Sequence, residues 1–322
     1  MPAKPATPGS SPPIAGREDG PDDPLEIDAA GWRATLRRAG KRFSRDRATM
    51  SAGSLAYHGF LALFPAVIAG LGILTLISIS DGTIRTLTHG INKALPPGAS
   101  GVFDAAVQAA TRHSTASLAA VIVGILVAIW SVSSAFAALQ QALDTAYEVP
   151  DRTFLARRLR SVPLLVASVV LGGLSVALIV FGSPIGSAIA STAGFSGSAW
   201  NIIWTVVRWV AGLVFMTLLF SALYYFGPNR EAPRWQWVSP GGLAGTAIFL
   251  LASLGFSFYV SRFGSYGKTY GSFAGVAILI FWLYLTGIAI LLGAEINAEA
   301  ERQAALDSGD RSARARAAGI AA

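Results

Sequence analysis

The chain lacks cysteine and is poor in charged residues. None of its 322 residues is Cys, which excludes a disulfide-built secreted domain and cysteine-ligated zinc or iron–sulfur sites. Charged residues make up only 13% of the chain, whereas soluble domains average about 25%. Apolar residues make up 53%, and so few charges cannot solvate a soluble protein with that much apolar area. The composition therefore argues against two or three soluble domains.

What the chain has instead is a series of long apolar runs. A helix needs about 20 residues to cross a bilayer, and strands rarely exceed about ten residues, so the length of the runs favours helices. The sequence therefore predicts an all-α integral membrane protein with six transmembrane helices. The expected spans are residues 53–79, 118–139, 162–181, 205–226, 241–260 and 273–293.

The positions of lysine and arginine predict the orientation of these spans. Of the 25 basic residues, 19 precede the first span, follow the last span, or lie in the loops after the second and fourth spans. Because basic loops stay on the cytoplasmic side, both termini are expected to be cytoplasmic. The net charge of +7 then indicates topology and attraction to anionic lipid headgroups. A nucleic-acid surface is the weaker interpretation of that charge.

Segments outside the spans carry shorter helical patterns. Trp32, Leu36, Ala39 and Phe43 share one helical face among arginines, which is typical of a helix lying in the membrane interface. Helical spacing also recurs on both sides of Pro96-Pro97-Gly98, and this pattern predicts a hairpin that is either a lid packed on the spans or a gate. The expected organisation is a disordered tail (1–30), a basic amphipathic interfacial helix (31–50), the six-span membrane domain (51–300) with an outer-face helical hairpin (81–117), and a cytoplasmic tail (301–322).

Motifs within and at the ends of the spans carry a family resemblance. They are Ala52-Gly53-Ser54-Leu55-Ala56-Tyr57 and Leu63-Phe64-Pro65 in the first span, Leu139-Gln140-Gln141-Ala142-Leu143-Asp144-Thr145-Ala146-Tyr147 at the end of the second, Tyr224-Tyr225-Phe226-Gly227-Pro228-Asn229 at the end of the fourth, and Gly293-Ala294-Glu295-Ile296-Asn297-Ala298 at the end of the sixth. With these motifs, residues 32–300 resemble the YihY/BrkB family of bacterial inner-membrane proteins. His58 stands where that family more often has a second tyrosine. The resemblance implies a six-helix inner-membrane protein of poorly defined activity, whose members have been labelled virulence factors, transporters and, historically, ribonuclease BN.

The residues needed for nuclease chemistry are scarce. A metal-dependent nuclease needs clustered His and carboxylate ligands, but the three histidines, His58, His89 and His113, form no His-x-His or His-x-x-x-His pair. No Gly-x-x-x-x-Gly-Lys phosphate loop occurs either, so ATP coupling within this chain is unsupported. We therefore expect no catalytic residues, no metal and no cofactor, and we interpret the chain as something other than an enzyme.

Polar residues within the spans are the better functional signal, because placing them in the bilayer is costly. Under the predicted topology they form an inner layer near the cytoplasmic face and an outer layer at the opposite face. The inner layer consists of Tyr57, His58, Gln140, Gln141, Asp144, Tyr224, Tyr225, Asn229, Glu295 and Asn297, and the outer layer of Arg208, Tyr259, Arg262, Tyr266, Lys268 and Tyr270.

Each of these residues also has a structural interpretation. Asp144 and Glu295 are as well explained by ion pairs with nearby arginines, and Arg208 by snorkelling to the outer headgroups. Tyr224 and Tyr225 fit an interfacial aromatic belt. Small residues and prolines are expected to shape helix packing and kinks. Those with a structural role are Pro65, Pro228, Gly241, Gly245, Gly271 and Gly275.

Three functions follow from these observations, in order of preference. The first is a membrane transporter or a permease for lipids or other amphiphiles, with the inner layer as the substrate path. The second is a non-enzymatic scaffold of the cell envelope, and the third is the ribonuclease. Membrane lipids are the expected partners, nucleic acid is not, and a homo-oligomer is left open.

Overall fold

The computed structural model describes residues 27–76, 81–95, 99–112, 118–195, 197–230, 238–262 and 272–307. In these ranges the chain folds into helices joined by short connections, without strands. The helices are α1 (Ala29–Arg45), α2 (Ala48–Leu76), α3 (Asp81–Ala94), α4 (Ser100–Arg112), α5 (Leu118–Ala146), α6 (Phe154–Ala167), the π-helical segment η2 (Ser168–Gly172), α7 (Gly173–Ala193), α8 (Ser198–Phe226), α9 (Pro240–Arg262) and α11 (Ser272–Asp307).

Six of the helical segments are long and apolar enough to cross a membrane, which confirms the predicted six-helix membrane fold. They are Ala48–Val67, Leu126–Ala146, Phe154–Ala193, Ser198–Phe226, Pro240–Arg262 and Phe273–Ala304. The third differs most from its expected range of 162–181, because α6, η2 and α7 join into 40 residues. At 1.5 Å per residue this segment is about 60 Å long, twice the thickness of the hydrocarbon core. A helix of that length must tilt or extend beyond the bilayer.

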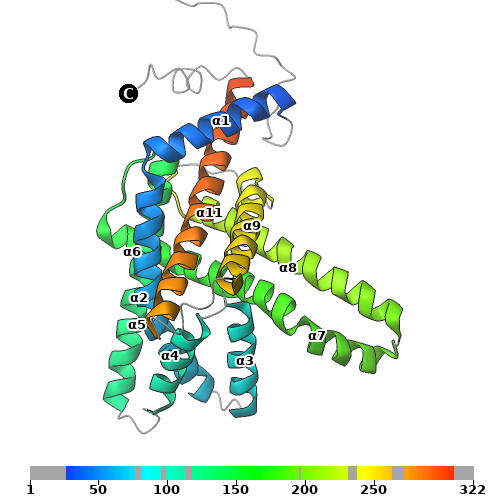
Figure 1. Ribbon diagram of the computed structural model, residues 1–322. Helices are drawn as coiled ribbons and strands as arrows, with labels where there is room; N and C mark the ends of the chain where they lie inside the picture. The colour runs from blue at the N-terminus through cyan, green and yellow to red at the C-terminus, as the bar shows by residue number, and fades with distance from the viewer. Residues whose placement is uncertain are drawn as a thin grey trace, which may run out of the picture.

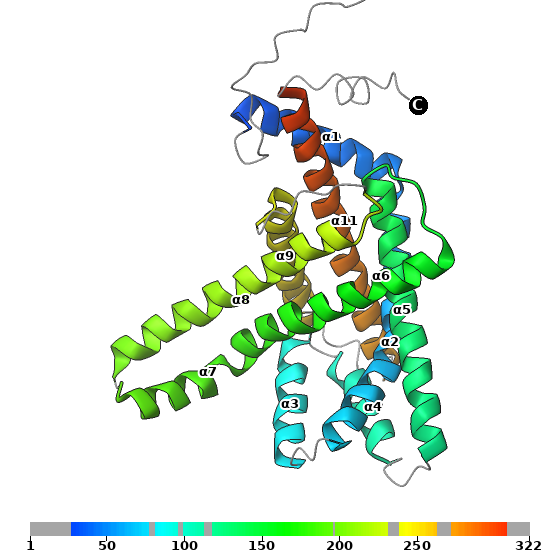
Figure 2. The same ribbon diagram turned by 180° about the vertical axis from the view of Figure 1, so that it is seen from behind.

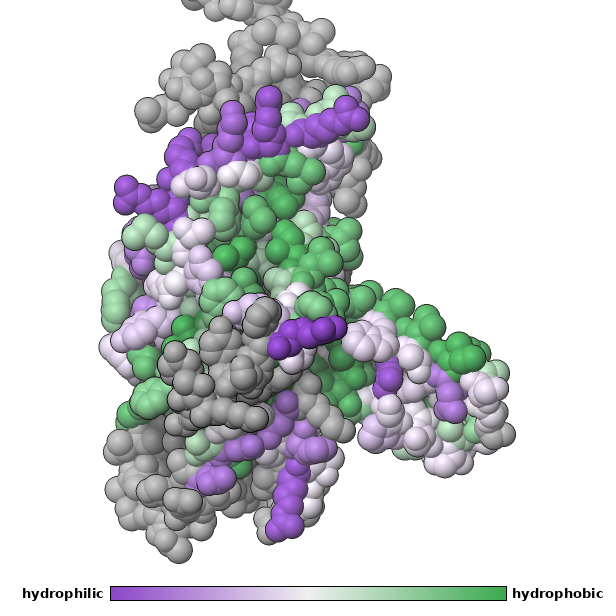
Figure 3. Space-filling model, in the orientation of Figure 1, coloured by the Kyte–Doolittle hydropathy of each residue, from purple (hydrophilic) through white to green (hydrophobic). Residues whose placement is uncertain are grey.

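Four of the spanning helices form an upright bundle. α2, α5, α9 and α11 run alongside one another, α1 lies across one end, and α3 and α4 lie at the other end (Figures 1 and 2). Small side chains permit close contact within the bundle: a Cβ on Gly287 of α11 would lie 3.1 Å from the Cα of Ala52 in α2. Hydrophilic residues gather over α1, while hydrophobic residues cover much of the sides of the bundle (Figure 3). We refer to the two ends as the α1 end and the α3–α4 end.

The helices α7 and α8 form an arm that leans away from this bundle (Figures 1 and 2). Its outer part is held by tryptophans on α8 that lie over two glycines of α7. Trp204 Nε1 donates to the carbonyl of Gly182 at 2.5 Å, and Trp200 Nε1 donates to the carbonyl of Gly186 at 3.2 Å. The Gly-x-x-x-Gly spacing of Gly182 and Gly186 lets the two helices approach closely. Sequence analysis did not single out this pair.

The amphipathic segment near the N-terminus is helical, but part of its expected membrane face packs on protein. Gly31, Thr35 and Ala39 are buried in α1, which packs against α11. Leu36, expected on the buried apolar face, is 52% exposed. α11 continues as far as Asp307, so it carries the sixth span into the expected tail and provides the surface on which α1 lies. Contact of α1 with a membrane stays a prediction.

The two helices of the expected outer hairpin are also present. Phe103 of α4 is buried, and Ala99 and Val102 are buried in a cluster with Leu279 of α11, against which Phe60 of α2 packs. Whether these helices act as a lid or a gate, and which side of the membrane they face, stay predictions. The turn at 96–98, the end of the expected hairpin at 113–117 and most of both expected tails lie outside the described residues.

Candidate functional site

A partly buried arginine organises the first polar network at the α1 end. Arg152, just before α6, donates to the carbonyls of Gly227 at 2.6 Å and Pro228 at 2.7 Å, and to Gln140 Oε1 of α5 at 3.1 Å. Burial lowers the pKa of Arg152, while the charge of Asp144 raises it. The carbonyls that follow the last turn of α8 are thus satisfied by one guanidinium, which ties the end of α8 to α5.

Asp144 and Asn229, two residues of the predicted inner layer, meet in this network. Asp144 is 1% exposed, and its Oδ1 accepts a hydrogen bond from the backbone N–H of Asn229 at 2.7 Å. Asn229 Oδ1 in turn accepts from Arg152 Nε at 3.2 Å, and its Nδ2 donates to the carbonyl of Pro150 at 2.9 Å. These contacts hold one backbone turn in place, while Asp144 Oδ2 is buried without a hydrogen-bond partner among the described residues. The place of both residues in a substrate path stays a prediction.

Replacing Arg152 with Gln is expected to lower the free energy of unfolding by about 2 kcal/mol, because a shorter amide leaves buried carbonyls unsatisfied. Hydrogen exchange at residues 227–230 should quicken at the same time. Arg160→Gln is the matched control, since Arg160 is exposed in the neighbouring helix α6 and the charge change is identical. Equal stability of the two variants in detergent unfolding experiments would contradict the assignment.

A second network surrounds Asn297 of α11. Its Oδ1 accepts from the backbone N–H of Gly241 at the start of α9 at 3.1 Å, and its Nδ2 donates to the Tyr147 hydroxyl at 3.0 Å and to Glu301 Oε1 at 2.9 Å. Arg230 pairs with Glu301 at 2.6 Å and lies over the ring of Tyr147. Burial raises the pKa of the Tyr147 hydroxyl, which therefore stays neutral. The network joins α9 and α11 to the residues that follow α5 and α8.

The third network is a group of ion pairs between α1 and α11, which we call the arginine–carboxylate cluster. At its centre Glu299 has no exposed side-chain surface. It accepts hydrogen bonds from Arg38 Nε at 2.6 Å and Arg302 Nη1 at 2.5 Å and forms an ion pair with Arg42 Nε at 2.6 Å. A buried carboxylate needs such partners, because leaving it unpaired is costly. The cluster consists of Arg38, Arg42, Arg45, Glu148, Glu299 and Arg302.

Glu148 is the second carboxylate of the cluster and lies nearer to solvent. Its oxygens lie 2.7 Å from Arg42 Nη1, 3.0 Å from Arg45 Nη2 and 2.7 Å from Arg302 Nη2. The contact with Arg42 is an ion pair without full hydrogen-bond geometry. Burial alone would raise the pKa of Glu148, but the three arginines outweigh it and lower the pKa. Glu148 therefore stays ionised and fastens the connection after α5 to α1.

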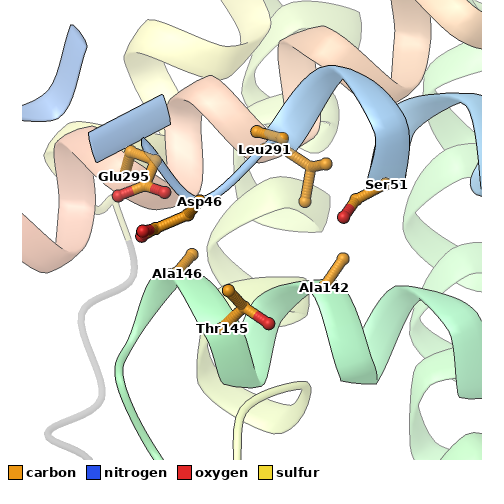
Figure 4. Close-up of a pocket in the computed structure, with 8 residues that line it drawn as sticks. Asp46, Ser51, Ala142, Thr145, Ala146, Leu291 and Glu295 are labelled. Carbon is orange, nitrogen blue, oxygen red and sulfur yellow. The ribbon is translucent and has the colours of Figure 1, made fainter. Parts of the chain in front are cut away.

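Glu295 is outside all three networks and lines a pocket of its own. The pocket lies between the start of α2, the end of α5 and α11, with Asp46 and Glu295 on one side of it (Figure 4). Its enclosed volume is about 10 Å³, close to the least that holds one water molecule, so the pocket is far smaller than common sites for organic ligands. The lining residues are Asp46, Ala48, Ser51, Ala142, Thr145, Ala146, Leu291 and Glu295.

The remaining inner-layer residues lie elsewhere. Tyr57 is 60% exposed on α2, and the His58 ring lies at its edge. His58 Nδ1 lies 2.9 Å from the carbonyl of Ser54, one turn earlier. The exposed side chain of Gln141 points away from the core, and the ring of Tyr225 contacts Phe226 edge-on. None of these residues lines the pocket beside Glu295.

Tyr224 of the inner layer lies among residues with an expected structural role. Tyr224 is buried and donates from its hydroxyl to the carbonyl of Ile290 at 2.9 Å, in contact range of Gly245 and Gly293. Pro65 lies inside α2. Gly275 is buried in α11, whereas Gly271 is outside the described residues. Tyr224 thus fills the seam between α8, α9 and α11, where packing explains it.

The outer layer is only partly described. Arg208 of α8 reaches across the arm and donates from Nη1 to Ser183 Oγ of α7 at 2.5 Å. Tyr259 is 47% exposed and stacks on Phe256. Tyr266, Lys268 and Tyr270 lie outside the described residues.

Sequence analysis missed the residues that do most of the pairing. Glu299 and Glu301 were not singled out, although each follows an inner-layer residue, Glu295 or Asn297, at a spacing of four on one helix. The arginines at 38, 42 and 45 are spaced by four and three residues and so share one helical face. Matching these two patterns would have predicted the ion pairs between α1 and α11. Within the described ranges no three His, Asp or Glu side chains form a metal-binding group.

The comparisons with known proteins point to one group of membrane proteins. Residues 39–318 match the family model described as virulence factor BrkB. A ribonuclease-like protein of Bacillus subtilis, YfkH, is 32% identical over 82% of the chain and 94% of its own length. UPF0761 membrane proteins of Aliivibrio salmonicida and Nitrosospira multiformis are 29% and 28% identical, each over 80% of the chain. The match covers 80% of the former protein but only 58% of the latter. No solved structure matches the chain.

Proposed function

The chain belongs to the BrkB family of multi-pass membrane proteins, and from that premise we propose that it moves amphiphilic molecules within the membrane. The molecules would carry an anionic headgroup and an apolar part that stays in lipid. We further propose that the α1 end faces the cytoplasm of a bacterial inner membrane. Arg33, Arg37 and Lys41 would then meet anionic headgroups, since they share one exposed face of α1.

The observation that carries this proposal is the position of Arg208 in the arm. Its neighbours on α8 are apolar and open to lipid, with Val206 57% and Val210 55% exposed. An arginine within a span is costly, and a snorkelling side chain would extend to the membrane surface. Arg208 instead lies over Gly182 and bonds Ser183, while its Nε has no hydrogen-bond partner among the described residues. A guanidinium held at this seam with spare donor capacity suits a passing phosphate.

The ribonuclease alternative draws on a name that belongs to the Bacillus relative. General acid–base catalysis needs a side chain free to exchange a proton with substrate. At the α1 end, Glu148, Glu299 and Glu301 are instead engaged by arginines. This engagement supports ranking a nuclease below the movement of amphiphiles.

A lipid-movement assay tests the proposal. Proteoliposomes would carry fluorescent phosphatidylglycerol labelled on its headgroup side, and dithionite quenching would report transfer between leaflets. We expect the wild-type chain to transfer the probe and Arg208→Gln to slow transfer roughly tenfold, equivalent to about 1.4 kcal/mol. Arg262→Gln is the control, because Arg262 lies over the Phe258 ring at the end of α9, away from the arm seam.

The outcomes separate the candidate functions. Equal rates for the Arg208 and Arg262 variants would remove Arg208 from the path. A wild-type chain that transfers neither phosphatidylglycerol nor a zwitterionic lipid would favour the envelope scaffold. A scaffold also predicts that deleting residues 81–117 abolishes the cellular phenotype while Arg208→Gln leaves it intact.

A further inference from the structure

Two carboxyl groups face the small pocket at the α1 end, each from a different element. Glu295 comes from α11, and Asp46 comes from the connection between α1 and α2 (Figure 4). Ser51 and Thr145 bring hydroxyl groups to the same lining. All four side chains offer oxygen atoms, which are the ligands that hard cations prefer.

Each carboxyl group has a buried oxygen without a hydrogen-bond partner among the described residues: Oε2 of Glu295 and Oδ2 of Asp46. Glu295 is 1% exposed, so water does not compensate its charge. Ionised carboxylates only accept hydrogen bonds, and two of them therefore cannot satisfy each other. A buried carboxylate charge without a partner is unfavourable. A cation or a proton bound between the two carboxyl groups would compensate it.

The nearby arginines do not fill this role, because Arg42 is bound to other carboxylates and Arg45 pairs with only Asp46 of the two. Arg42 lies between Glu148 and Glu299 at 2.7 and 2.6 Å. Arg45 contacts Glu148 and the other oxygen of Asp46, Oδ1, both at 3.0 Å. Asp46 is thus partly neutralised by Arg45, whereas Glu295 forms no ion pair among the described residues.

The geometry points to a binding site for a small monovalent cation, Na⁺, between Glu295 and Asp46. One of the two charges is shared with Arg45, so the pocket presents about one negative charge, which a monovalent ion balances. Mg²⁺ keeps several waters, for which the pocket has too little room. The C-terminal end of α5 lines the pocket, and the negative end of a helix dipole favours positive charge. This inference goes beyond the movement of amphiphiles, because cation binding needs no transported substrate.

The experiment measures binding of ²²Na⁺ to the purified full-length chain in detergent, with choline chloride holding the ionic strength constant. We expect saturable binding of one Na⁺ per chain at pH 7.5, and a Kd at least about tenfold higher in Glu295→Gln. Asp151→Asn is the matched control, since Asp151 pairs with Arg157 away from the pocket and is 63% exposed. It should bind Na⁺ like the wild-type chain.

A second variant covers the case in which Glu295→Gln does not fold. Thr145→Val keeps the size of the side chain and removes only the hydroxyl, so it should raise the Kd several-fold in a folded protein. Absence of saturable ²²Na⁺ binding to the wild-type chain would overturn the proposal, and so would unchanged binding in both pocket variants. Proton uptake at the pocket without Na⁺ binding would equally overturn it and assign the site to a proton. All of these results leave the lipid assay of Arg208 unaffected.

Discussion

Replacing Glu299 with Gln is expected to lower the free energy of unfolding by about 3 kcal/mol, at the lower end of the cost of breaking a buried ion pair. The amide has nearly the same volume, so the change removes charge rather than packing. It leaves three guanidinium groups without their shared anion, and the side chains of Arg42 and Arg302 are each only 11% exposed. Repulsion between them should drive α1 off α11.

Two measurements separate this effect from a general loss of stability. Unfolding in mixed micelles gives the free energy, and trypsin cleavage at Arg33 and Arg37, both exposed on α1, reports release of that helix. Glu148→Gln is the control, because it removes the same charge beside Arg42 and Arg302, which also pair with Glu299, at a side chain that is 35% exposed. Solvent can replace that partner, so the loss should stay below about 1 kcal/mol. Equal losses in the two variants would show that burial of Glu299 is not what matters.

The number of spans could be predicted from the sequence because each crossing of the bilayer requires a long apolar helix. Every backbone polar group must be bonded within a helix, so apolar runs of sufficient length have one solution. The arm could not be predicted in the same way. Lipid is as apolar as a protein core, so hydropathy does not distinguish an exposed residue such as Val206 from a buried one such as Leu143. Only the glycines at 182 and 186 marked the seam between α7 and α8.

For the candidate site, the sequence predicts how deep a residue lies in the membrane but not which direction its side chain faces. Position along a span predicts depth, and Asp144, Glu295 and Asn297 do lie together at the α1 end. Rotation about each helix axis depends on packing that a single chain does not reveal, which is why Tyr57 faces outward at a similar position on its helix. Glu299 was missed for another reason. The sixth span was expected to end before this residue, whereas α11 continues past it and packs against α1.

The second large effect is expected at Gly293, where α9 and α11 touch through their backbones. A Cβ at this position would lie 2.8 Å from the carbonyl oxygen of Gly241 and 3.0 Å from the Cα of Gly245. Backbone atoms cannot rotate aside as a side chain can, so Gly293→Ala must push the two helices apart. We expect a loss of about 3 kcal/mol, the upper range for overpacking a core. The separation should also break the hydrogen bond from Gly241 to Asn297.

Gly255→Ala is the matched control for this prediction, because it is the same substitution on α9 at a position with no atom within 4 Å of the added Cβ. There the alanine removes only the backbone freedom of glycine, so stability should rise by about 0.5–1 kcal/mol. The opposite signs of the two variants, measured by unfolding in mixed micelles, would show that contact with α11 sets the cost. Hydrogen exchange at the Gly241 amide should quicken in Gly293→Ala alone. A stable Gly293→Ala protein with a protected Gly241 amide would mean that α9 and α11 do not approach as closely as the structure places them.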